Sequence, residues 1–250
     1  MTAFSGGVDS AVLAKIGADQ GHLAVIVDSE SYAREERDAA EGFAKAMGIA
    51  FEVVWNSELA DPNYAANPIN RCYFCRQGLG DVMNRLAKER GYDAVAVGTN
   101  LDDLGDYRPG LQAIKEKELW QPFVELQMTK AEVREVAKHL GLPVWDKPSM
   151  ACLSSRIPYG EPVTMEKLTR IGRAESMLRA KGFRQVRVRT IDGGAAARIE
   201  VLPEEIVRLN EMLVDVSAEL SFLGYKRIDV DPKGYRTGSL NEMIVRTNAH

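Results

Sequence analysis

Residues 5–10 read Ser5-Gly6-Gly7-Val8-Asp9-Ser10, and they follow the short apolar run at residues 1–4. An amphipathic stretch, predicted to be a helix, covers residues 10–18. A glycine-rich loop between strand and helix predicts an anion site, because glycines let the backbone approach closely and helix-terminal amides attract negative charge. No lysine follows the glycines, so the loop differs from the Walker sequence of γ-phosphate transfer. A simple turn with Asp9 as the N-cap is the structural alternative.

The first part of the chain alternates apolar runs with helical patterns. Residues 23–27, 51–55 and 94–97 are short and almost continuously apolar, as is typical of strands covered on both faces. Residues 32–47 and 130–140 have apolar positions at helical spacing, and Thr129 with Glu132 predicts a capping box. This alternation predicts a parallel α/β sheet flanked by helices, with ligands bound beyond the carboxyl ends of the strands.

The order of elements changes after Lys147-Pro148. We predict a helix over residues 164–181, strands over 185–190 and 195–201, a helix from 203 to about 220, and a strand over 227–230. This order is typical of a smaller C-terminal α+β domain. We therefore expect one domain at residues 1–150 and a second at residues 151–250.

The composition is that of a globular protein. Of 250 residues, 45% are hydrophobic and 27% are charged, which excludes disorder, collagen and coiled coil as the main state. No stretch approaches the ~20 apolar residues of a membrane span, and no signal peptide is recognisable, so we expect a cytoplasmic protein without membrane partners. The net charge of −4 makes nucleic acid an unexpected partner.

Three cysteines are candidate metal ligands. Cys72 and Cys75 form a Cys-x-x-Cys pair between two arginines, and Cys152 lies far along the chain. Thiolates at i and i+3 of a helix start can bind one ion, and nearby arginines favour the ionised form. Three thiolates suit an iron–sulfur cluster with one open iron, an open zinc site, or a Cys72–Cys75 disulfide beside a nucleophilic Cys152. Unremarkable buried thiols are the structural alternative, and the spacing does not choose between iron and zinc.

The C-terminal part contains a candidate anion site. Arg187 and Arg189 share one face of a predicted strand, where two guanidiniums can clamp a phosphate or carboxylate. Ion pairs with acids such as Glu200 are the alternative. Glu175 falls on the apolar stripe of the helix at 164–181, so it needs a partner, and we expect Arg187 or Arg189.

The loop at residues 5–10 resembles the PP-loop of the ATP pyrophosphatase superfamily, whose members cleave ATP between its α- and β-phosphates. The resemblance implies that the pyrophosphate binds to the loop, that adenosine binds at the end of the second strand, and that a third strand end lines the same crevice. The implied ATP-binding residues are Ser5, Gly6, Gly7, Asp9, Ser10, Val27, Ser29 and Gly98. Asp9 and Asp103 are the implied Mg²⁺ ligands, with a solvated acidic loop as the alternative at residues 102–103.

Four segments are similar to the LarE family of sulfurtransferases, which build a nickel-pincer nucleotide cofactor. They are residues 5–10, 106–110, 145–160, and 186–189 with 197–200. The resemblance implies ATP-dependent adenylation of the carboxylates of pyridinium-3,5-biscarboxylic acid mononucleotide, release of AMP and pyrophosphate, and conversion to thiocarboxylates. The implied substrate-binding residues are Arg156, Arg187 and Arg189, and the implied catalytic residues are Cys72, Cys75, Cys152 and Glu175.

The family uses two sources of sulfur. Some members sacrifice a single cysteine, whereas others hold a [4Fe–4S] cluster on three cysteines and carry an extra sulfide on its free iron. Counted from Lys147 to Arg156, the sacrificed position corresponds to Ala151, so this chain is similar to the cluster type. The resemblance also implies sulfide or another sulfur donor as a partner, and a homo-oligomer. A PP-loop tRNA thiolation enzyme and an ATP-binding regulatory module are the alternatives.

Overall fold

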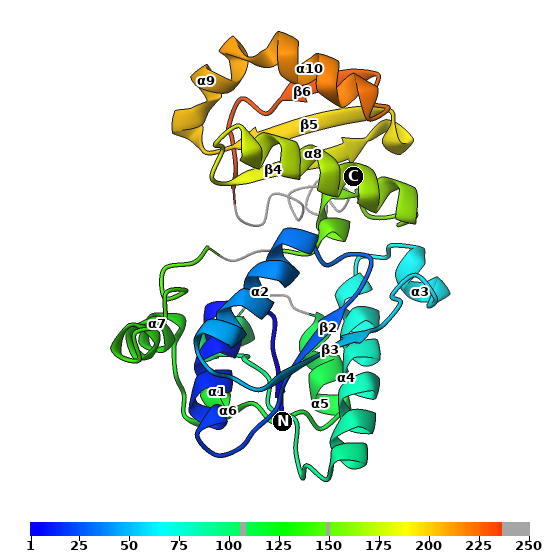
Figure 1. Ribbon diagram of the computed structural model, residues 1–250. Helices are drawn as coiled ribbons and strands as arrows, with labels where there is room; N and C mark the ends of the chain where they lie inside the picture. Colours follow the sequence, from blue (N-terminus) through cyan, green and yellow to red (C-terminus); the bar gives the residue numbers. More distant parts are fainter. Residues whose placement is uncertain (106–108, 149–150, 237–250) are drawn as a thin grey trace. The chain divides into compact units, whose positions relative to one another are not determined.

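The computed structural model describes residues 1–105, 109–148 and 151–236 (Figure 1). The chain divides into two compact units, residues 1–64 with 68–151, and residues 65–67 with 152–250. No helix in the described ranges is long and apolar enough to cross a membrane. Residues 106–108 of the segment similar to LarE, and residues 149–150 of the next one, lie outside the described part.

Unit 1 contains a parallel sheet. Its strands β1 (Thr2–Ala3), β2 (Ala24–Asp28) and β3 (Phe51–Trp55) pair in the order β1-β2-β3. On the free side of β1, Ala96 forms single parallel bridges with Thr2 and with Trp120. The strand predicted at residues 94–97 is therefore wrong as a strand, because two-residue β1 offers too short a partner for a continuous ladder.

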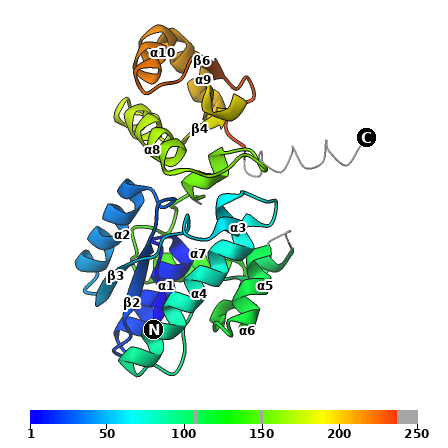
Figure 2. The same cartoon turned by 90° about the vertical axis from the view of Figure 1, so that its right-hand side faces the viewer.

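Helices cover both faces of this sheet, as the apolar runs predicted (Figure 2). Ala24 and Ile26 of β2 belong to one buried cluster and Val25 to another, as expected from the alternation of side chains along a strand. The first face packs α1, α2, α6 and α7, and the second packs α4 and α5. The described helices of this unit are α1 (Val8–Ala18), α2 (Arg34–Ala46), α3 (Pro62–Ala65, whose last residue is counted in unit 2), α4 (Arg71–Arg90), α5 (Pro109–Glu116), α6 (Pro122–Glu125) and α7 (Lys130–His139).

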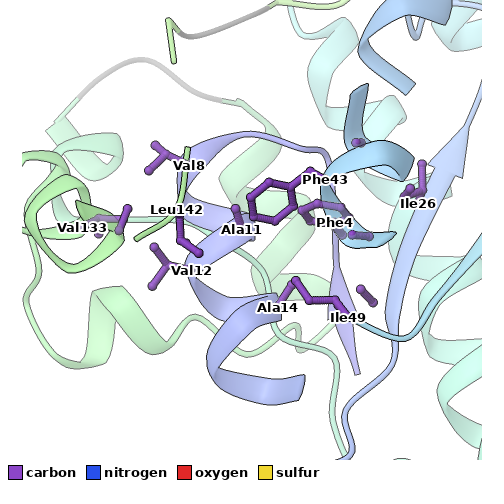
Figure 3. Packing of buried hydrophobic residues seen from close by; sticks show 14 of the residues in the cluster. Phe4, Val8, Ala11, Val12, Ala14, Ile26, Phe43, Ile49, Val133 and Leu142 are labelled. Atoms are coloured by element: carbon purple, nitrogen blue, oxygen red, sulfur yellow. The ribbon is translucent and has the colours of Figure 1, made fainter. Parts of the chain in front are cut away.

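The first cluster fixes the start of α1 beside the end of β1. Figure 3 shows Phe4 and Phe43 together, with ring centroids 5.9 Å apart, and Val133 of α7 near Val12 of α1. Each large apolar side chain that is removed from water here contributes about 1.5–3 kcal/mol. The capping box of Thr129 and Glu132 at the start of α7 is confirmed. This packing holds the loop at residues 5–10 in place.

Unit 2 is a three-stranded sheet packed with helices. β4 (Val186–Ile191) and β5 (Ala196–Val201) are antiparallel, and β6 (Arg227–Val230) runs parallel to β5. The predicted order helix-strand-strand-helix-strand is confirmed, beginning with α8 (Met165–Ala180). The continuous helix predicted from residue 203 is wrong. It is divided into a 3₁₀ turn (Pro203–Glu205), α9 (Ile206–Glu211) and α10 (Leu213–Phe222), because Met212, with ψ 3°, departs from helical geometry.

Candidate functional site

The loop at residues 5–10 is closed by hydrogen bonds within itself. The Ser10 hydroxyl accepts from the Ser5 amide at 3.2 Å and donates to the Gly7 carbonyl at 3.0 Å. Gly6 has φ +68°, and a Cβ at that position would lie 2.8 Å from the Ala40 Cβ of α2, so glycine is required. The helix begins at Val8, two residues earlier than predicted, with Gly7 as its N-cap and no side-chain cap in the described chain. The alternative that made Asp9 the N-cap is therefore wrong, and the first amides of α1 are left for an anion.

Asp9 lies in a network that links three segments. Its Oδ1 accepts from Asn100 Nδ2 at 3.2 Å, and its Oδ2 forms an ion pair with Lys130 Nζ from α7. Asp103 accepts from the backbone amide of Asn100 at 3.1 Å, and Asp102 accepts from the amide of Lys130 at 2.8 Å. The network brings Lys130 to the phosphate loop. Asp9 and Asp103, the two predicted Mg²⁺ ligands, both accept a hydrogen bond from Asn100.

Two further side chains contact the loop, namely Tyr32, which precedes α2, and Lys147. The Tyr32 hydroxyl donates to the Ser5 carbonyl at 3.0 Å, and burial, together with the Glu36 carboxylate, raises the pKa of Tyr32 well above its usual range. Tyr32 therefore stays protonated and acts as a hydrogen-bond donor. Lys147 Nζ donates to the Gly6 carbonyl at 3.2 Å and pairs with Glu36 at 2.8 Å.

Sequence reasoning missed both lysines, because Lys130 and Lys147 are 121 and 141 residues away from their partners in the loop. A signal did exist for each. Lys130 follows the N-cap Thr129, and Lys147 is the third residue of the LarE-like segment at residues 145–160.

The predicted adenosine end lies at the same sheet edge as the loop, because β1, β2 and the Ala96 bridge are parallel. Ser29, directly after β2, donates to Glu58 at 3.1 Å, and Ser31 donates to the same carboxylate oxygen. Val27 is half-buried at the penultimate position of β2. A Cβ on Gly98 would lie 2.8 Å from the Asp9 Cβ, so this glycine allows close contact with the start of α1. The structure thus brings the predicted ATP-binding residues of unit 1 to one edge.

Cys72 and Cys75 lie in the first turn of α4, as predicted. Cys72 is exposed and Cys75 is half-buried. The turn is held against α5, because Tyr73 donates to Glu116 at 2.7 Å and a Cβ on Gly110 would lie 3.2 Å from the Cys72 carbonyl oxygen. This packing presents the two thiols from a fixed helical turn.

Cys152 belongs to unit 2, where it is half-buried at the N-cap of the 3₁₀ turn Leu153–Arg156. Cysteine sulfurs are the donors that iron–sulfur clusters use, so the residue types at these three positions fit such a group. Within the described residues, no three His, Cys, Asp or Glu side chains form a group that could hold a metal ion.

Glu175 is completely buried and organises one side of unit 2. It accepts two hydrogen bonds from Arg156, at 2.7 and 2.9 Å, one from Arg179 at 2.8 Å, and one from the Val188 amide at 3.0 Å. Burial opposes the charge of Arg156, but the Glu175 carboxylate outweighs it and raises the pKa of Arg156. The expectation that Glu175 pairs with Arg187 or Arg189 is therefore wrong. The helix α8 packs on the Val186 and Val188 side of β4, whereas the two arginines alternate to the opposite side.

Arg187 and Arg189 differ in their partners. Arg189 forms a two-pronged ion pair with Glu200, with one contact at 3.1 Å, and donates to the Ser155 carbonyl at 3.0 Å. Arg187 is 8% exposed, donates to the Tyr235 hydroxyl at 3.0 Å and lies 4.6 Å from that ring's centroid. Burial and the charges of Arg156 and Arg189 lower the pKa of Arg187. Among the described residues no carboxylate forms an ion pair with Arg187, and the nearby charge of Glu200, which pairs with Arg189, offsets this repulsion only in part, so an added anion would relieve it further.

Comparison with known proteins decides the family, although no family model matches. A pyridinium-3,5-bisthiocarboxylic acid mononucleotide synthase of Lactiplantibacillus plantarum is 34% identical over 251 residues, which cover 98% of this chain and 89% of that protein. The chain belongs to the LarE family. LarE enzymes are PP-loop proteins, so the chain is an ATP-dependent sulfurtransferase, as the loop and the other LarE-like segments predicted.

Two further proteins are similar to this LarE chain. An uncharacterized protein of Synechocystis is 46% identical over 251 residues, covering 98% of this chain and 93% of that protein. The structure of the U34-tRNA thiolase NcsA from Methanococcus maripaludis, with its [4Fe-4S] cluster, aligns with a TM-score of 0.44 and 24% identity over 61% of each chain. The family assignment rests on the sequence relatives and not on this partial structural overlap.

Proposed function

We propose that this LarE protein uses ATP to adenylate the carboxylates of pyridinium-3,5-biscarboxylic acid mononucleotide and then replaces AMP with sulfur, leaving thiocarboxylates. The observation that carries the proposal is the 34% identity, along 98% of the chain, to a synthase named for that product. Two built features support it, a phosphate loop in unit 1 and a buried arginine cluster in unit 2.

The ATP half of the reaction is assigned to unit 1. The uncapped amides of α1, with Ser5 and Ser10, are proposed to hold the pyrophosphate of ATP, and Ser29 is proposed to contact the adenosine. Asp9 and Asp103 are proposed to hold Mg²⁺, because carboxylate oxygens suit that ion and both side chains contact Asn100. For Asp9 Oδ2 to bind the ion, its ion pair with Lys130 must break and the Mg²⁺ must take the place of the ammonium group.

The acceptor half is assigned to the arginines of unit 2. Arg187 is proposed to bind the phosphate of the mononucleotide, since it is buried, forms no ion pair with a carboxylate of the described residues, and is repelled by Arg156 and Arg189. Arg156 and Arg189 are proposed to flank that phosphate. Glu175 is proposed to act through Arg156, because its hydrogen bonds are directed to Arg156, Arg179 and the Val188 amide. It is therefore a positioning residue in this proposal.

The sulfur source is proposed to be a [4Fe–4S] cluster held by Cys72, Cys75 and Cys152. Three cysteine ligands leave one iron open, and when bound the cluster supplies sulfur that has been taken up from sulfide or another donor. The support is chemical: three cysteines supply sulfur ligands of the kind that such a cluster uses, and two of them lie three residues apart at the start of α4. Arg71 and Arg76 beside the pair favour thiolates over thiols.

The test is a sulfur-transfer assay with the anaerobically reconstituted protein, ATP, Mg²⁺, sulfide and the dicarboxylate mononucleotide. We expect the mass of the acceptor to rise by the replacement of oxygen by sulfur, with one AMP formed per transfer. Unmodified tRNA serves as the control acceptor, because a tRNA thiolase is the alternative enzyme. Sulfur in tRNA but not in the mononucleotide would refute the proposed substrate.

A further inference from the structure

Lys147 occupies a position at the phosphate loop that the loop's own sequence leaves without a cation. Its Nζ lies 3.2 Å from the Gly6 carbonyl oxygen and 2.8 Å from Glu36 Oε2. The side chains of Lys147 and Glu36 are only 22% and 19% exposed, so this pair is shielded from water to a large extent. An ammonium group has three donors, and within the described residues two of them are used here.

The backbone that carries Lys147 is held in place from α7. Arg134 donates to the Lys147 carbonyl at 2.9 Å and also to the carbonyl of Trp145. α7 itself packs on α1 through Val133 and Ala137 in the first buried cluster. The helix that begins at the loop and the segment that brings Lys147 to it are therefore braced by the same neighbour.

Two carboxylates near the loop, Asp9 and Glu36, would repel the phosphates of ATP. Asp9 is in the loop and Glu36 contacts Lys147, while Lys130 is engaged by Asp9. Pyrophosphate and ATP carry several negative charges, so the glycine amides alone leave much of that charge unbalanced. A lysine on a flexible four-carbon chain can move between a carboxylate and a phosphate over a short distance.

We propose that Lys147 is a phosphate-binding residue of the ATP site, with Glu36 as the counter-ion that holds it at the loop until the nucleotide binds. This inference rests on the proposed ATP site at residues 5–10 and adds a residue to it. Since the ammonium can pair with either Glu36 or the phosphate, the carboxylate competes with the ligand for Lys147.

Competition predicts opposite effects for the two partners. Lys147→Met removes the cation and should weaken the binding of inorganic pyrophosphate with Mg²⁺ by roughly ten- to hundredfold, the range for one charge-assisted hydrogen bond. Glu36→Gln removes the competitor, so pyrophosphate should bind at least as tightly as to the wild-type protein. A merely structural ion pair would give the same direction for both variants, because both break the same contact.

The experiment is titration calorimetry of the full chain with magnesium pyrophosphate and, separately, with adenosine, which has no phosphate. Lys147→Arg should restore most of the pyrophosphate affinity, and Lys45→Met, at an exposed lysine of α2, should leave it unchanged. Equal weakening by Lys147→Met and Glu36→Gln, or no effect of Lys147→Met, overturns the inference. Failure of the wild-type protein to bind pyrophosphate would refute the ATP site itself, and the role of Lys147 with it.

Discussion

Glu175 and Arg156 form a two-pronged ion pair in which the side chains are 0% and 1% exposed. The pair joins α8 to the 3₁₀ turn that follows Cys152. A buried pair of this kind contributes little over a well-packed apolar pair, but the loss of one partner leaves an uncompensated charge. The turn therefore depends on both residues being present.

Glu175→Gln should destabilise the protein by about 3 kcal/mol or more, because Arg156 would remain buried without its carboxylate. The matched control is Glu166→Gln on the same helix, where the carboxylate that pairs with Arg170 is 78% exposed and the pair is worth about 0.2–1 kcal/mol. Urea unfolding at neutral pH measures both. Equal losses in the two variants would show that the burial of the Glu175 pair has no energetic consequence.

Arg187→Met, unlike Glu175→Gln, should not destabilise the protein. The charge of Arg187 is buried and repelled by Arg156 and Arg189, so its removal should leave the free energy of unfolding within about 0.5 kcal/mol of wild type or raise it. The KM for the mononucleotide should rise roughly ten- to hundredfold, while the KM for ATP stays unchanged. Steady-state kinetics with each substrate varied in turn separates the effects, and a parallel rise in both KM values would contradict a phosphate contact at Arg187.

Gly6→Ala should lower the free energy of unfolding by more than the strain of its left-handed backbone angle alone. Gly6 and Gly141 have φ of +68° and +67°, but only a Cβ at Gly6 would meet another atom, the Ala40 Cβ at 2.8 Å. Gly141→Ala reports the strain of the left-handed conformation, about 1 kcal/mol, and Gly6→Ala should add about 1–3 kcal/mol of overpacking. Thermal unfolding compares the two.

The second substitution Ala40→Gly, made together with Gly6→Ala, should recover most of the added loss, because it removes the methyl group that the new Cβ meets. If the double variant is no more stable than Gly6→Ala alone, contact with Ala40 is not the cause.

The capping box gives a prediction about pH. Hydrogen bonds from the Thr129 amide and hydroxyl lower the pKa of Glu132 below the ordinary glutamate value of about 4.3. A carboxylate with a lowered folded-state pKa contributes stability that is present above the unfolded value and is lost as pH falls through the folded one. The difference in stability between wild type and Glu132→Gln should therefore be constant at neutral pH and shrink below about pH 4. A difference that does not change down to pH 2 would contradict this.

The sequence predicted what depends on local pattern and missed what depends on distant partners. The alternation of strands and helices, the capping box and the helical start at Cys72 are encoded within a few residues and were confirmed. Residues 94–97 look like a strand, but whether they form a ladder depends on how much of β1 faces them. Periodicity cannot reveal the partner of a buried charge, since Arg156 is 19 residues from Glu175 and on another element. Lys130 lies beside a capping box and Lys147 in a LarE-like segment, but both reach the phosphate loop only through tertiary folding, so these local patterns do not reveal the contact.

Cys72→Ser, Cys75→Ser and Cys152→Ser should each reduce the iron and acid-labile sulfide that the protein retains after anaerobic reconstitution. A cluster with three protein ligands loses a third of them in each variant, and serine oxygen is a poor substitute for thiolate. The control is adenylation, measured as pyrophosphate release with the dicarboxylate mononucleotide, which should persist because the ATP and arginine residues are unchanged. Elemental analysis beside that assay separates loss of the cluster from loss of folding. Full sulfur transfer by Cys72→Ser, or zinc in place of iron in the reconstituted wild-type protein, would refute an iron–sulfur cluster as the carrier.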